Sequence, residues 1–170
     1  SRRQPGSAFK PLIYSLALDN TYTAASMLKD RPLVFKNSEW KPKDFSKQYK
    51  GKLSLRYSLV HSKNIPTINL TMALGRKKII EHAKILGLTA NMPNDLTIGL
   101  GTASVSLPEL INTYSIFANG GYLIKSIFIS KILNKDNSIL EDNSELSMPK
   151  VLSEDTAFLT TSILRDVIKY

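Results

Sequence analysis

The sequence GSAFKPLIYSLAL occupies residues 6–18 of this 170-residue chain and decides the fold. Its apolar positions recur every three or four residues, which is typical of a helix that buries one face. Ser7 and Lys10 are one helical turn apart, so the hydroxyl and the amine share a face. We predict a buried helix that begins near Ser7. Its first turn should be distorted, because Pro11 cannot donate a backbone hydrogen bond and crowds the Ser7 carbonyl.

This S-x-x-K spacing can combine a nucleophile with its base. A lysine whose pKa is lowered by burial takes the hydroxyl proton as the serine attacks a carbonyl. The string alone is weak evidence, since about two matches are expected by chance and the chain has four, at Ser7, Ser26, Ser38 and Ser147. Only Ser7 opens an apolar helix after a Pro-Gly turn, where free backbone N–H groups favour a developing anion.

A second polar triplet, Ser62-Lys63-Asn64, is the chain's one S-x-N sequence. Its serine hydroxyl can relay a proton, and its asparagine amide can hold a lysine and grip a substrate amide. Read alone, the triplet is equally well explained as a helix end with polar caps.

The remaining pattern is mostly helical. A capping box at Ser106 and Glu109 opens one helix, and Ser153 caps the last one. Turn residues 134–138 separate two apolar runs, 122–133 and 139–140, which predict the chain's one β-hairpin. Residues 30–52, which include Trp40, look like a loop. The predicted helices span residues 9–18, 53–61, 76–86, 106–119 and 153–169.

The positive charge is concentrated in one stretch. Of the net charge of +9, +7 lies between Lys29 and Lys63. We interpret this stretch as a solvated loop and predict no nucleic-acid binding, because no recognition helix or aromatic-interleaved motif accompanies it.

Without cysteine, disulfides and thiol catalysis are excluded. His61 and His82 lack the spacing of metal ligands, and no apolar run approaches the roughly 18 residues of a membrane span.

Five stretches in the same order resemble one protein family. They are RQPGSAFKP at 3–11, WKP at 40–42, LRYSLVHSKN at 55–64, GLGTASVSLPEL at 99–110 and FANGG at 117–121. Together they resemble the class A penicillin-binding proteins, the bifunctional peptidoglycan synthases. S-x-x-K and an S-D-N-type triplet belong to the motif set shared by penicillin-binding proteins and class A β-lactamases.

The resemblance implies a DD-transpeptidase that uses no metal or cofactor. Ser7 would be the nucleophile toward D-Ala-D-Ala stem peptides and β-lactams, with Lys10 as its base. Ser62 would relay the proton to the leaving amine, and Asn64 would bind the substrate amide. The parent protein would be anchored upstream in the inner membrane and would act on its extracytoplasmic, periplasmic face.

The third motif of the family, K-T-G, does not occur in residues 1–170, where Lys125-Ser126 is followed by Ile127. We therefore expect residues 1–170 to be an incomplete transpeptidase domain that lacks the strands before Ser7 and the K-T-G strand after Tyr170. It would be mainly α with one β-hairpin, the helical part of the family's α+β fold with the central sheet largely missing. Alone it would be inactive, and an oligomer or partner chain could complete the fold.

Two alternatives from other classes stay open. A non-catalytic helical module could use the positive stretch to bind an anionic polymer of the cell envelope. A β-lactamase-like hydrolase would share both triplets, but it would need a deacylating glutamate, and no candidate stands out in the sequence.

Overall fold

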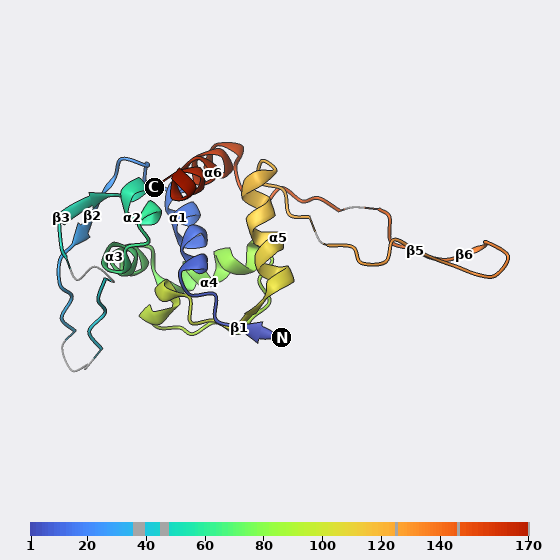
Figure 1. The fold of residues 1–170 in the computed structure, drawn as a ribbon, viewed down its shortest axis with the longest axis horizontal. Helices are drawn as coiled ribbons and strands as arrows, with labels where there is room; N and C mark the ends of the chain where they lie inside the picture. Colours follow the sequence, from blue (N-terminus) through green and yellow to red (C-terminus); the bar gives the residue numbers. More distant parts are fainter. Residues whose placement is uncertain (36–39, 45–47, 125, 146, 170) are drawn as a thin grey trace.

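Helix α1 (Lys10–Leu18) lies at the centre of the helical body, and the other helices pack around it (Figure 1). The computed structural model describes residues 1–35, 40–44, 48–124, 126–145 and 147–169. Every residue of α1 except Leu16 is buried, which confirms the predicted buried helix. Tyr14 and Phe9 are among the largest fully buried side chains.

The helices that surround α1 are mostly those that the sequence predicts. They are α2 (Leu55–Val60), α3 (Asn64–Leu74), α4 (Arg76–Ile85), α5 (Leu107–Ala118) and α6 (Glu154–Lys169). Helix α3 has no counterpart among the predicted elements. Its Pro66 lies in the first turn, where backbone N–H groups have no partner within the helix and a proline is tolerated. None of the helices among the described residues has the length and apolar character to cross a membrane.

The strands form three separate antiparallel pairs. They are β1 (Arg2–Arg3) with β4 (Val105–Ser106), β2 (Met27–Asp30) with β3 (Gly51–Ser54), and β5 (Lys131–Leu133) with β6 (Ile139–Asp142). The third pair is the predicted hairpin, although its first strand is shorter than expected. The other two pairs were not predicted, because strands of two to four residues give too short an alternation to read. The chain is mainly α, as expected.

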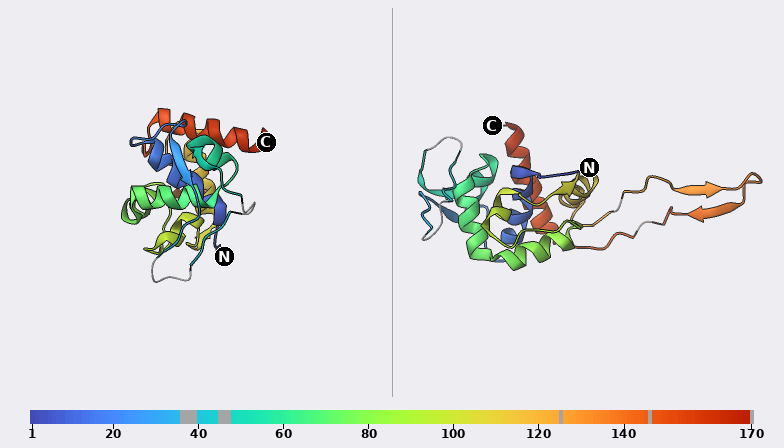
Figure 2. Two further views of the ribbon diagram at one scale, coloured as in Figure 1. Left: turned by 90° about the vertical axis from the view of Figure 1, so that its left-hand side faces the viewer. Right: turned by 90° about the horizontal axis from the view of Figure 1, so that it is seen from below.

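The β5–β6 hairpin projects away from the helical body (Figures 1 and 2). The Tyr122–Lys150 bridge and the bond from the Leu123 N–H to the Pro149 carbonyl join the two sides of this arm at its base. Apolar side chains along the arm are exposed, with Phe128 83% exposed. The arm adds nothing to the core, which belongs to the helices.

A short 3₁₀ helix, η1 (Gly6–Phe9), precedes α1 and carries Ser7. This tight turn confirms the expected distortion before Pro11. Gly6 has φ +57°, and its N–H donates to the Gly101 carbonyl at 3.2 Å. A Cβ on Gly101 would lie 2.0 Å from the Gly6 carbonyl oxygen, so a side chain cannot be accommodated there. Two glycines in close contact thus fix the turn that presents Ser7.

Candidate active site

A cavity of about 550 Å³ opens where η1, the end of α2 and the start of α3 meet. Three of the four predicted site residues, Ser7, Ser62 and Asn64, line it. The fourth, Lys10, is only 1% exposed and reaches this wall from α1. The full lining is Ser7, Asp44, Gln48, Lys50, Tyr57, His61, Ser62, Lys63 and Asn64.

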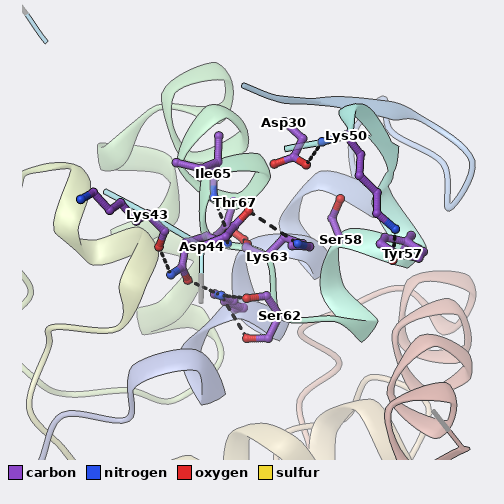
Figure 3. Close-up of polar contacts among 12 residues, drawn as sticks. Asp30, Lys43, Asp44, Lys50, Tyr57, Ser58, Ser62, Lys63, Ile65 and Thr67 are labelled. Atoms are coloured by element: carbon purple, nitrogen blue, oxygen red, sulfur yellow. Dashed lines mark hydrogen bonds and ion pairs between the residues drawn. The ribbon is translucent and has the colours of Figure 1, made fainter. Parts of the chain in front are cut away.

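The Lys10 amine joins the two predicted motifs. Its Nζ donates to the Ser62 carbonyl oxygen at 2.6 Å, to Ser62 Oγ at 3.0 Å and to Asn64 Oδ1 at 2.8 Å. Figure 3 shows these contacts at the turn that carries Ser62. The structure thus brings Lys10, Ser62 and Asn64 together, although more than fifty residues separate the first from the others.

An unusual backbone conformation aims Ser62 at the lysine. Ser62 has φ +49°, in the left-handed region that non-glycine residues enter at a cost of about 1–2 kcal/mol. The Ser62 N–H donates to the Leu59 carbonyl, and the Lys63 N–H donates to the Ser58 carbonyl. This pair of bonds is the Schellman motif that ends many helices, usually with glycine in the place that Ser62 occupies. The turn directs both the carbonyl and the hydroxyl of Ser62 toward Lys10.

Burial tunes the basicity of the lysine. Removal of the Lys10 amine from water lowers its pKa to about 8, although the nearby Asp44 carboxylate acts in the opposite direction. A pKa near the working pH gives both a usable fraction of free base and a useful driving force for proton transfer. Lys10 therefore has the properties of a general base.

Ser7 is exposed in η1 and lines the same cavity. Within the described part of the chain, no hydrogen bond joins its hydroxyl to Lys10. The contact between them is through the backbone, where the Lys10 N–H donates to the Ser7 carbonyl. The structure places Ser7 at the same cavity as the Lys10–Ser62–Asn64 cluster, without a hydrogen bond between the two side chains of the S-x-x-K motif.

Two further residues, Lys43 and Asp44, contact Asn64 and were not predicted from the sequence. The Lys43 carbonyl accepts a bond of 2.8 Å from Asn64 Nδ2, and the Asp44 carboxylate accepts from the backbone of α3. Asp44 is 3% exposed. The one signal in the sequence is an acidic residue among lysines, in a stretch that the charge pattern predicts to be a solvated loop.

The basic stretch is only partly a solvated loop. Lys29, Lys41 and Lys52 are exposed, as expected. Lys63, however, is buried, and its Nζ lies 3.8 Å from Asp44 Oδ2. The Lys50 Nζ donates to the Tyr57 hydroxyl at 2.8 Å. Part of the positive charge therefore belongs to the cavity wall; Lys36 and Lys47 lie outside the described residues.

The two histidines have different surroundings. His82 is buried against Ser15, with 3.0 Å between Nε2 and Oγ, and burial lowers its pKa to about 4. His61 ends α2 and is exposed. Where the structure describes the chain, no three histidine or carboxylate side chains are grouped to hold a metal ion.

The chain is similar to known proteins in sequence and in fold. Residues 1–170 match the penicillin-binding protein transpeptidase domain family. Penicillin-binding protein 1A of Pseudomonas aeruginosa is 38% identical, and the match covers 82% of this chain and 18% of that protein. Penicillin-binding protein 1A of Neisseria cinerea is 33% identical, and the match covers 98% of this chain and 22% of that protein.

The crystal structure of penicillin-binding protein 1A from Haemophilus influenzae has the same fold. The match covers 98% of this chain and 30% of the Haemophilus influenzae chain, with a TM-score of 0.88 and 28% sequence identity. The chain spans about a fifth of the length of the curated relatives that it matches. Since the family match extends over the whole sequence, the chain belongs to the transpeptidase domain family of the penicillin-binding proteins.

Proposed function

We propose that this chain carries the acylation site of a peptidoglycan DD-transpeptidase, with Ser7 as the nucleophile. One observation supports the proposal above the others. The buried Lys10 amine, one helical turn from Ser7, is bonded to both polar residues of the S-x-N triplet at the edge of an open cavity. A helix cap alone would not require a buried lysine with a lowered pKa.

In the first step, neutral Lys10 takes the proton of the Ser7 hydroxyl as Oγ attacks the carbonyl of the penultimate D-Ala. The Ser7 backbone N–H supplies one donor to the oxyanion. The bond from that carbonyl to the terminal D-Ala nitrogen then breaks. The proton passes from Lys10 through the Ser62 hydroxyl to the leaving amine, and an ester on Ser7 remains.

In the second step, the amine of another stem peptide attacks this ester. Its proton returns through Ser62 and Lys10 to Ser7 Oγ, and a new peptide bond forms. Asn64 orients the donor peptide. One Nδ2 hydrogen is bonded to the Lys43 carbonyl, so the other is available for a substrate carbonyl.

The same attack on a β-lactam gives a stable ester, which provides the test. The full-length protein is incubated with a fluorescent penicillin, and the modified peptide is identified by mass spectrometry. We expect one adduct, on Ser7, that is absent in Ser7→Ala. A labelled wild type with the adduct elsewhere, or no labelling at all, would contradict the proposal. Rapid turnover of nitrocefin would favour a hydrolase instead.

The 170-residue chain by itself should acylate poorly. The resemblance assigns the substrate-carboxylate grip and the second oxyanion donor to the K-T-G strand, and residues 1–170 contain no K-T-G. We expect at most weak labelling of this chain under conditions that label the full-length protein. Robust labelling would refute this expectation.

The full-length protein would act on the extracytoplasmic face of the inner membrane, where its substrate lies. The alternative function, a non-catalytic module for anionic envelope polymer, is favoured by the exposed Lys29, Lys41 and Lys52. It predicts polymer binding that is unchanged in Ser7→Ala and no covalent adduct with penicillin, so the same labelling experiment distinguishes the two.

A further inference from the structure

Asp44 caps helix α3 from a distant part of the chain. The residue at the N-cap position, Lys63, makes no side-chain cap hydrogen bond. Instead, Asp44 Oδ1 accepts from the backbone N–H groups of Asn64 and Ile65, the latter at 3.3 Å (Figure 3). A carboxylate at this position satisfies free N–H groups and suits the helix dipole. The first residue of α3 is therefore fixed by a loop twenty positions earlier in the sequence.

The same loop also sets the direction of the Asn64 side chain. The Lys43 carbonyl accepts from Asn64 Nδ2, while Lys10 Nζ donates to Asn64 Oδ1. With a partner at each end, the amide can present only one remaining hydrogen to the cavity. Adjacent residues 43 and 44 thus hold both the backbone and the side chain of Asn64.

Asp44 is also a buried charge beside the cluster. Its side chain is enclosed, and Lys63 Nζ lies 3.8 Å from Oδ2. The carboxylate raises the pKa of Lys10 against the larger effect of burial. The other titratable groups nearby are Lys50, Tyr57, His61 and Lys63 on the cavity wall, and Tyr14 one turn further along α1.

We propose that Asp44 is a positioning residue of the acylation site, which holds Asn64 toward Lys10 and places a negative charge beside that lysine. The inference rests on the proposed function, since it concerns the same site. It predicts that two properties of Asp44 can be separated. The hydrogen-bond acceptor fixes geometry, and the charge sets the pH at which Lys10 becomes a base.

The test compares Asp44→Ala with Asp44→Asn in the full-length protein. The rate constant for β-lactam acylation of Ser7 is measured as a function of pH. Asp44→Ala removes acceptor and charge, and we expect the rate to fall about 10- to 100-fold, as displaced catalytic groups do. Asp44→Asn keeps an acceptor oxygen, so its maximal rate should stay within about threefold of wild type. Its pH profile should move to lower pH, because Lys10 loses its neighbouring negative charge.

Asp30→Asn is the matched control. Asp30 is also buried, and its Oδ2 accepts the Lys50 N–H at 2.8 Å, but among the described residues no hydrogen bond joins it to Lys10, Ser62 or Asn64. We expect its maximal rate and pH profile to equal those of wild type. Thermal unfolding reports any loss of fold, and if Asp44→Ala does not fold, Asp44→Asn and the control decide the outcome.

The outcomes are distinguishable. If the wild type is not acylated on Ser7, the proposed function fails. If the wild type is acylated, a wild-type rate in Asp44→Ala or an unshifted profile in Asp44→Asn overturns the role of Asp44. An equal shift in Asp30→Asn also overturns it, because the effect would then not be specific to the site.

Discussion

Helices α3 and α5 both begin at a carboxylate, but the two carboxylates come from very different places. Glu109 lies within α5 and closes a capping box with Ser106 three residues earlier. Asp44 reaches α3 from a loop twenty residues away. The comparison shows that a local cap stabilises only its own helix. A cap from a distant segment also fixes the position of the first residues of the helix relative to that segment. Here the first residue of the helix is Asn64, the last residue of the S-x-N triplet.

The largest expected difference is between the effects of removing the basic side chain that contacts each helix start, Lys10 at α3 and Arg2 at α5. Lys10→Met removes the amine that contacts Ser62 and Asn64 and that we propose as the base, so we expect acylation of Ser7 to fall about 100- to 10,000-fold. At α5, Arg2→Met removes an exposed ion pair with Glu109, which should change stability by less than about 1 kcal/mol. Acylation should be unchanged. Both are measured with β-lactam in the full-length protein, and similar acylation rates in the two variants would contradict the contrast.

The second difference is pH dependence. The Lys10 amine has a pKa of about 8 and must be neutral to act as a base, so acylation should fall about tenfold for each pH unit below that value. The α5 cap should not change its protonation state in the pH range around 8. Although burial opposes ionisation of Glu109, hydrogen bonds from Thr89 and Ser106 lower its pKa to about 2.

The control for this profile is stability at acid pH. Because the pKa of Glu109 is lowered on folding, its contribution is present above the ordinary value of 4.5 and is lost as pH falls toward about 2. Thermal unfolding measured from neutral to acid pH therefore shows the pH range in which the stabilising contribution of Glu109 to α5 is lost. An acylation profile with its midpoint in that acid range would exclude Lys10 as the titrating base.

A third experiment breaks the local cap alone. Ser106→Ala removes the acceptor for the Glu109 N–H, and loss of such a cap destabilises a protein by about 1 kcal/mol. Urea unfolding should show this loss while the acylation rate of the folded protein stays at the wild-type value. A reduced rate would mean that the start of α5 is coupled to the site after all.

The smallest effect concerns the turn before α3. Ser62→Gly and Ser62→Ala both remove the hydroxyl, but only glycine adopts φ +49° without strain. We expect Ser62→Gly to be more stable than Ser62→Ala by about 1 kcal/mol in thermal unfolding. Their acylation rates should be equally reduced. Equal stability would show that the left-handed turn relaxes when the hydroxyl is absent.

The elements that the sequence predicted are those with local signals. Helix α1 has helical apolar spacing, α5 has its capping box, and α6 has Ser153, whose Oγ accepts the Thr156 N–H at 3.2 Å. Helix α3 was missed because its cap is not local and Pro66 interrupts its start. No sequence pattern could show that Asp44 lies against the N–H of Asn64.

The residues of the candidate site, like the helices, were predicted only where a local signal or the resemblance pointed to them. Spacing placed Ser7 and Lys10 on one face, yet the hydrogen bonds of Lys10 go to Ser62 and Asn64. The resemblance identified these residues, although it could not give the left-handed conformation of Ser62 or the bond from Asn64 to the Lys43 carbonyl. The Asn64–Lys43 bond depends on contact between distant segments, and the Ser62 turn replaces the usual glycine by a serine, so neither periodicity nor spacing encodes them.

The projecting arm determines what would happen if a protease cleaved the chain between α5 and α6. Its exposed residues lie between α5 and α6, while α6 packs on α1, α2 and α5. A cut at the arm would therefore sever the polypeptide without separating its halves. We expect the nicked protein to give two bands on a denaturing gel and a single peak in gel filtration, because α6 is retained by its packing rather than by its connection.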